Sequence, residues 1–327
     1  MVGVWSGLAD SRFVRDGQGA RAGVWRLLGA VVGGAVVAAV AAVAVWCLTM
    51  AGVTAALGLA PEGLQGLGEA AQRLVDPAVV GAPIQVARLL VTSAVDGGAL
   101  LVFAAFAVAA LHEPLHRSVT AAPRIRWRLA LTGGLLALII LAPLAVAERR
   151  FASDGPIPIL TLGNDLGQRL AYAGAALLLI PAAAAEELVF RGWVLRRVAS
   201  FQVPTSFLIL GTGLAFSALH FDFNPDAFLM RAIMGCGFAY MTLRLGGIEF
   251  SSGVHAAHNM LIVLYLEPIS LRTQASPISP LSLMTDLSLI VGYFIITEAV
   301  VHAPLLRRLA GVRLDELSPP DNQTGRT

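Results

Sequence analysis

The sequence predicts an all-α membrane protein, a polytopic transmembrane helical bundle of about eight spans. Of its 327 residues, 57% are hydrophobic and only 13% are charged, about half the charged fraction of an ordinary soluble domain. A membrane-crossing helix needs about 20 predominantly apolar residues. The apolar runs that approach this length are 27–50, 86–111, 129–147, 170–190, 206–221, 227–243, 248–266 and 281–301.

These runs divide the chain into five regions. The first run is longer than the roughly 7–15 apolar residues of a signal peptide, so we interpret it as a retained span. We expect a cytoplasmic segment at 1–26, an N-terminal region of three spans at 27–165 and a core with the polar motifs at 166–270. The final transmembrane helix follows at 271–316, and a polar, disordered tail at 317–327.

The arginines predict the orientation. They are frequent before the first span, in the loop at 112–128, after the fourth span and after the eighth. Because basic residues gather on the cytoplasmic side, both termini are predicted to be cytoplasmic in a cell (plasma) membrane. Arg149 and Arg150 lie on the outer side and oppose this pattern. The net charge of +2 predicts no nucleic-acid partner; the expected partners are membrane lipid and a peptide or protein substrate.

Two adjacent glutamates, Glu186 and Glu187, interrupt the fourth apolar run, and Arg191 follows one turn later. Each charge at the centre of a membrane helix costs about 2.5–3.5 kcal/mol on insertion scales, so such groups are paired or functional. Glu187 and Arg191 are four residues apart and can pair on one helix face. Glu186 is turned about 100° away from Glu187, and it is therefore the stronger candidate for chemistry.

Two further polar sets lie in the fifth and seventh apolar runs. Phe216 and His220 are four residues apart, as are His255 and Asn259, so each pair shares a helix face. A buried carboxylate can act as a general base on water, a neighbouring histidine can orient that water, and a histidine with an asparagine can stabilise an oxyanion. Alternatively, Glu186, His220 and His255 are a common ligand set for Zn²⁺. Both arrangements suit hydrolysis of an amide, and the residues do not choose between them.

Other polar residues in the spans have simpler interpretations. His258 lies off the face shared by His255 and Asn259, which favours a structural role. Asp96 and Glu298 are isolated acids that either lie near an interface, cap a neighbour or relay protons.

The three sets, Glu186-Glu187-x-x-x-Arg191, Phe216-x-x-x-His220 and His255-x-x-x-Asn259, resemble the ordered motifs of the CPBP family of intramembrane proteases. That family includes the eukaryotic CAAX prenyl endopeptidase and bacterial Abi-type proteins. The resemblance implies an intramembrane endopeptidase, CAAX-processing-like, that hydrolyses a peptide bond near the membrane surface. It extends over about residues 170–266.

The resemblance also implies roles. Glu186 would activate water, His220 would share that water or ligate a metal, and His255 with Asn259 would hold the oxyanion. Glu187, Arg191 and Phe216 would support the site. Many relatives have an asparagine three positions after the second-motif histidine, whereas this sequence has Phe223 there and Asn224 one position later.

The predicted span limits create a geometric difficulty. They place Glu186 near the cytoplasmic end of its helix and His220 near the outer end of the next, a separation of about 15–20 Å at 1.5 Å per residue. Catalysis requires contact through one water at most. Either the segment after the fourth span re-enters the membrane, or the helices tilt, or the limits are misplaced.

Two other functions remain open. One is a non-catalytic membrane scaffold or bacteriocin-immunity-type protein in which the motifs form a structural polar network. The other is a proton-coupled transporter with Asp96 and Glu298 as relay groups, which predicts inverted repeats that the sequence lacks.

Overall fold

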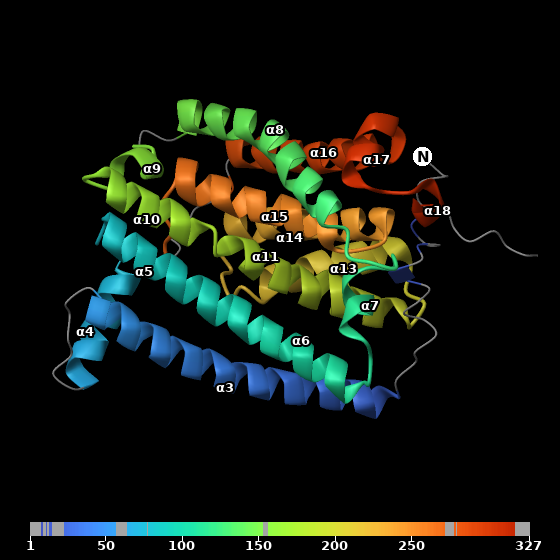
Figure 1. Cartoon of the computed structure of the whole chain (residues 1–327), viewed down its shortest axis with the longest axis horizontal. Helices are drawn as coiled ribbons and strands as arrows, with labels where there is room; N and C mark the ends of the chain where they lie inside the picture. Colours follow the sequence, from blue (N-terminus) through green and yellow to red (C-terminus); the bar gives the residue numbers. More distant parts are fainter. Residues whose placement is uncertain are drawn as a thin grey trace, which may run out of the picture.

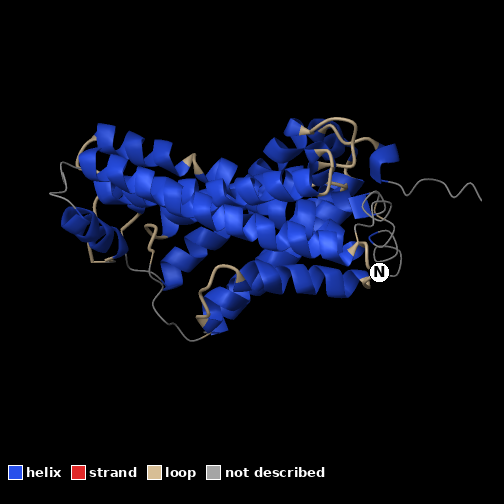
Figure 2. Cartoon of the chain, turned by 90° about the horizontal axis from the view of Figure 1, so that it is seen from below, coloured by secondary structure: helices blue, strands red, loops and turns tan. Residues whose placement is uncertain are grey.

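Helices form most of the chain that the structure describes. The computed structural model describes residues 23–56, 64–76, 78–152, 156–271 and 280–317, together with positions 8, 11, 13, 14 and 278. Within these residues the structure has no strand, and an isolated antiparallel bridge joins Thr120 to Gly247 (Figure 2). The predicted all-α class is therefore confirmed. Most of the predicted N-terminal segment and all of the tail after residue 317 lie outside the described residues.

The helices follow one another with short connections. The first half contains α3 (Val24–Ala56), α4 (Leu64–Val75), α5 (Ala82–Thr92), η1 (Ser93–Gly97), α6 (Gly98–Ala110), α7 (Leu115–Val119), α8 (Trp127–Ala152) and α9 (Pro158–Thr161). The second half contains α10 (Leu166–Ala176), α11 (Leu179–Glu187), η2 (Leu188–Val194), α12 (Leu195–Ala199), α13 (Thr205–Ala218), α14 (Pro225–Leu245), α15 (Glu249–Leu261), η3 (Ile262–Leu266), α16 (Pro280–His302), α17 (Pro304–Ala310) and α18 (Leu314–Leu317). The three η segments are wider π-helical turns within longer helices.

The long helices lie roughly side by side in layers (Figure 1). Helix α3 forms one edge and packs on α6, while α8 and α16 cover the opposite edge. Between them lie α11 and the α13–α14 pair, with α15 packed on both α8 and α11. The central position of α11 and α15 matters because they carry the glutamate and histidine motifs.

Close backbone contact holds α15 against α8. A Cβ atom on Gly253 would lie 1.9 Å from the carbonyl oxygen of Ala130, and one on Gly133 would lie 2.6 Å from that of Phe250. Glycine is therefore required at both positions for the two helices to approach this closely. This contact fixes the helix that carries His255 relative to the rest of the bundle.

Five helices are long and apolar enough to cross a membrane among the residues described: Val24–Ala55, Ala82–Ala110, Trp127–Phe151, Leu166–Ala199 and Ser282–His302. They correspond to five of the eight predicted spans. The other three predicted spans are the helices α13, α14 and α15. Helix α13 is apolar but has only 14 residues, α14 contains Arg231 and Arg244, and α15 has 13 residues.

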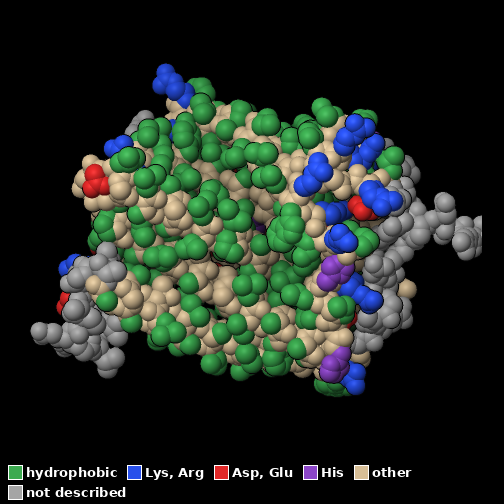
Figure 3. Space-filling model, viewed as in Figure 1, with side chains coloured by type: hydrophobic (Ala, Val, Ile, Leu, Met, Phe, Trp, Pro, Cys, Tyr) green, Lys and Arg blue, Asp and Glu red, His purple; other side chains and the backbone are tan. Residues whose placement is uncertain are grey.

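Arginine side chains gather at one end of the bundle, over α7 and α17 (Figure 3). Here the chain turns between α14 and α15, and the Ile248 amide donates to the Val119 carbonyl at 2.9 Å. Buried ion pairs hold this end together, including Arg126 with Glu249 at 2.8 Å. The basic end is thus a packed part of the fold, with an apolar belt beyond it.

Candidate active site

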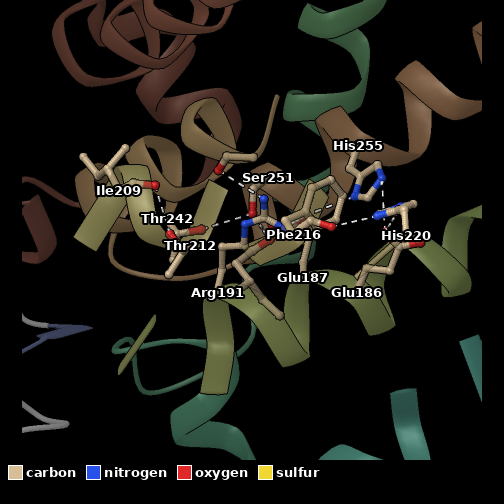
Figure 4. A network of polar contacts seen from close by, with 12 residues as sticks. Glu186, Glu187, Arg191, Ile209, Thr212, Phe216, His220, Thr242, Ser251 and His255 are labelled. Carbon is tan, nitrogen blue, oxygen red and sulfur yellow. Dashed lines mark hydrogen bonds and ion pairs between the residues drawn. The ribbon is translucent and has the colours of Figure 1, made fainter. Parts of the chain in front are cut away.

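The two adjacent glutamates lie at the C-terminal end of α11, which is directly followed by the π-helical turn η2. The alanine-rich sequence before them favours a regular helix. Figure 4 shows their side chains pointing in different directions, Glu187 toward Arg191 and Glu186 toward His220 and His255. The carboxylates therefore have separate surroundings, although they are neighbours in the chain.

Glu187 forms a fully buried ion pair. Its Oε1 accepts a hydrogen bond from Nη1 of Arg191 at 3.0 Å, and both side chains have 0% exposure. The same guanidinium donates from Nη2 to the Gly235 carbonyl at 3.1 Å and lies 4.4 Å from the Phe216 ring centroid. The i, i+4 contact expected from the sequence is present, and cation–π contact adds to it.

His255 connects this pair to Glu186. Its Nδ1 lies 3.1 Å from Oε1 of Glu187, and its ring stacks on Phe238 with 4.8 Å between centroids. Because Glu187 is paired with a cation and acts as an acceptor, we infer that Nδ1 carries the proton. The neutral ring then presents the Nε2 lone pair toward Oε2 of Glu186, 3.8 Å away.

His220 reaches the same carboxylate from another element, the turn that follows α13. Its Nδ1 lies 2.8 Å from the Phe216 carbonyl oxygen. A carbonyl can only accept, so Nδ1 donates and the lone pair of the neutral ring is again at Nε2. That atom lies 3.9 Å from Oε2 of Glu186.

Three acceptor atoms thus converge: Oε2 of Glu186 and the two Nε2 atoms. Oε2 is buried and has no hydrogen-bond partner among the described residues. The gaps of 3.8 and 3.9 Å exceed a direct hydrogen bond, and contacts of this length are commonly mediated by water. A water at this point can donate only two hydrogen bonds, so the three acceptors also favour one additional shared proton.

The same three residues are the predicted zinc ligands. Both Nε2 atoms lie 3.8–3.9 Å from Oε2 of Glu186. The ligand set of Glu186, His220 and His255 stays a prediction, and we derive no chemical step through a metal.

Two further polar residues follow His255 on α15, His258 and Asn259. Asn259 is half-buried on α15, one turn beyond His255, and no hydrogen bond joins it to the glutamates or histidines described above. His258 is buried, and its Nδ1 lies 3.2 Å from the hydroxyl of Tyr293 on α16. This contact is consistent with the structural role expected for His258.

Three residues around Glu187 were not singled out from the sequence. Ser251 Oγ lies 3.1 Å from the Ile248 carbonyl oxygen and 3.2 Å from Oγ1 of Thr242 (Figure 4), Gly235 accepts from Arg191 and Phe238 stacks on His255. They come from α14 and α15, far from Glu187 in the chain. Only the three-dimensional packing of these helices reveals them.

The two isolated acids differ from each other. Glu298 accepts hydrogen bonds from Tyr240 at 2.5 Å and from Arg244 at 2.8 Å, so it is firmly paired. Asp96 lies in η1, within the second membrane-crossing helix.

Asn224, at the position displaced from the family pattern, donates its backbone amide to Asp222 Oδ1 at 3.1 Å.

The predicted separation of 15–20 Å between Glu186 and His220 is wrong, because the limit placed at Phe190 was too early. The fourth membrane-crossing helix continues through η2 and α12 to Ala199. Glu186 therefore lies 13 residues from that end, and His220 lies 15 residues beyond the start of α13 at Thr205. At 1.5 Å per residue, both are about 20 Å from the same end of the bundle.

Comparison with known proteins agrees with the motifs. Residues 168–261 match the family model described as type II CAAX prenyl endopeptidase Rce1-like. This region includes all three polar sets and confirms the resemblance inferred from them. The chain is also similar to the uncharacterized protein YyaK of Bacillus subtilis (strain 168), with 37% identity over 100 residues.

The similarity to YyaK is partial, since it covers 28% of this chain and 33% of the relative. The chain thus matches about a third of the length of that relative. No solved structure matches the fold. The comparisons support an Rce1-like, CAAX-type membrane protease at the level of the family, and they leave the chemistry to be argued from the residues.

Proposed function

We propose that this protein is an intramembrane endopeptidase in which Glu186 activates a water molecule to cleave a peptide bond near the membrane surface. The observation that supports this most strongly is the convergence of Glu186, His220 and His255 on one point. Glu186 comes from α11, His220 from the turn that follows α13 and His255 from α15, in the order of the family's motifs. Oε2 of Glu186, the atom at which they converge, has no hydrogen-bond partner among the described residues and is therefore free to accept a hydrogen bond from a water.

The first step is attack by water on the substrate carbonyl. Glu186 takes one proton from the water while the water oxygen forms a bond to the carbonyl carbon. His220, with its lone pair at Nε2, accepts the second water hydrogen as a hydrogen bond and orients the nucleophile. The Phe216 carbonyl holds the His220 ring in that tautomer.

The second step requires stabilisation of the oxyanion. When Nε2 of His255 carries the additional proton, the ring is an imidazolium. The ionised Glu187 stabilises this cation through its contact with Nδ1. Arg191 keeps Glu187 ionised by pairing with it in the buried site. The amide of Asn259 supplies a second donor once substrate is bound.

The last step is release of the amine. Glu186 returns the proton it took from water to the amide nitrogen, and the C–N bond breaks. Atoms and charges balance, because one water is consumed and one carboxyl and one amine product are formed. General-base catalysis typically increases a reaction rate by about 10²–10⁴-fold, and we expect Glu186 to contribute a factor of this size.

The family name suggests the class of substrate, a CAAX-type peptide. A CAAX-processing-like peptide, presented at the membrane with its lipid surroundings, is the proposed substrate. We further propose a plasma-membrane location with both termini cytoplasmic, since arginines are concentrated at one end of the bundle (Figure 3).

Purified protein assayed on a quenched peptide library, with and without a chelator, tests this function. We expect cleavage that chelator does not affect. Cleavage abolished by chelator and restored by Zn²⁺ would contradict the glutamate mechanism and support the metal-assisted alternative. Absence of cleavage by well-folded protein would favour the scaffold or immunity-type function.

A further inference from the structure

A patch of basic and apolar side chains lies where helix α17 packs on the beginning of α8. Its members are Trp127 and Arg128 of α8 and Leu305, Arg308 and Leu309 of α17, and each of them is exposed. Arginine and hydrophobic side chains lie together over this end of the bundle (Figure 3). We call these five residues the α8–α17 patch.

The α8–α17 patch lies at the level where membrane-crossing helices end. Trp127 is the first residue of the third such helix, and α17 begins two residues after the fifth one ends at His302. The Trp127 side chain is 74% exposed, and tryptophan is typical of the boundary between hydrocarbon and lipid headgroups. The arginines of the patch are therefore at the level of headgroups, and its leucines are beside acyl chains.

Arg128 is held in place but keeps free donors. Its Nε donates to the Leu309 carbonyl and its Nη2 to the Arg308 carbonyl, both at 3.0 Å. These two bonds cap the C-terminal end of α17. A guanidinium has five N–H donors, so three remain, including both on Nη1, without a partner among the described residues. A guanidinium fixed in this way can bind a phosphate with little further loss of side-chain freedom.

Arg308 adds a second positive charge. The bond from Arg128 to its carbonyl places the two residues next to each other, and the Arg308 guanidinium makes no hydrogen bond or ion pair with any residue that the structure describes. The described acids on adjoining segments, Glu249 and Glu316, both lie against the buried Arg126. The described residues therefore leave the charge of the α8–α17 patch uncompensated.

We propose that the α8–α17 patch binds an anionic phospholipid. Arg128 and Arg308 bind the phosphate of its headgroup, and Trp127, Leu305 and Leu309 contact its acyl chains. A zwitterionic phospholipid carries an ammonium group near its phosphate and therefore gains less from two arginines. Anionic lipids are characteristic of the cytoplasmic leaflet, which agrees with the orientation proposed for this end of the bundle.

Lipid binding to the purified full chain in detergent tests the proposal. The protein is titrated with dioleoyl phosphatidylglycerol or with dioleoyl phosphatidylcholine, and bound lipid is measured by native mass spectrometry. We expect phosphatidylglycerol to bind at least about tenfold more tightly, since each arginine near an anionic lipid surface contributes about fivefold in affinity. Arg308→Gln should reduce this preference about fivefold, and the double variant with Arg128→Gln should abolish it.

Controls separate this site from the general charge of the protein. Arg150→Gln removes an exposed arginine at the opposite end of α8 and should preserve the preference. Arg308→Lys keeps the charge and should retain most of it. Because Arg128 caps α17, the single Arg308→Gln variant is sufficient if the double variant does not fold. Inorganic phosphate is added as a competitor and should not displace phosphatidylglycerol, since it lacks acyl chains.

Equal binding of the two lipids to the wild type contradicts the inference, as does a preference that Arg308→Gln leaves unchanged or that Arg150→Gln also removes. Displacement of phosphatidylglycerol by an equal concentration of inorganic phosphate would show a site for free anions instead. The measurement uses no peptide, so a failure of the proposed peptidase function leaves it unaffected.

Discussion

Arg191 is the buried cation on which the geometry of Glu187 and His255 depends. Its replacement by methionine keeps most of the side-chain volume but removes the charge and the hydrogen bonds to Glu187 and Gly235. Both partners of the ion pair have 0% exposure, so Glu187 would remain as an unpaired buried carboxylate. Removing one partner of such a pair destabilises proteins by about 3–5 kcal/mol.

A double-mutant cycle gives the magnitude that is most informative. Glu187→Gln alone leaves Arg191 without its counter-charge and is expected to cost a similar amount. The double variant removes both charges and therefore should cost less than the sum of the single variants. We expect a coupling free energy of at least about 2 kcal/mol, near the upper end for contacting pairs.

The assay is equilibrium unfolding in detergent, followed by circular dichroism for the wild type, both single variants and the double variant. Glu69→Gln provides the control, since it removes an exposed charge and is expected to change stability by less than about 0.5 kcal/mol. Additive effects of the two single variants would refute the argument that the pair is buried and mutually dependent.

Two further predictions concern the surrounding bundle. In thermal unfolding, Gly253→Ala should destabilise the protein by about 1–3 kcal/mol, because its Cβ would lie 1.9 Å from the Ala130 carbonyl oxygen. The control Gly174→Ala has open space around it and should be neutral or stabilising in the same measurement. Glu298→Gln should lower the unfolding midpoint through its weakened contact with Arg244 while cleavage stays within about threefold of wild type. Loss of cleavage without destabilisation would instead support Glu298 as a relay group.

The polar sets of the site could be found in the sequence because charges are exceptional in apolar runs. The contacts within Glu187–Arg191 and Phe216–His220 span four residues, so helical periodicity was sufficient to predict them. The contacts of Gly235 join helices that are distant in sequence. No local pattern specifies which helices pack together, and these partners were therefore not predicted.

The fourth span ends later in the structure than the arginine pattern predicted. Arg196 and Arg197 follow the fourth apolar run and were assigned to the cytoplasmic side, so the span was ended at Phe190. In the structure, Arg196 donates to the Arg117 carbonyl and Arg197 pairs with Glu113. Because these partners satisfy the arginines, the helix continues and the site lies deeper than predicted.

The kcat/KM of the Glu186→Gln variant decides whether the Glu186 carboxylate activates the attacking water. Measured on a peptide cleaved by the wild type, with unchanged unfolding as proof of folding, the variant is predicted to be slower by at least about 100-fold. A kcat/KM within about threefold of wild type would show that Glu186 does not activate the water.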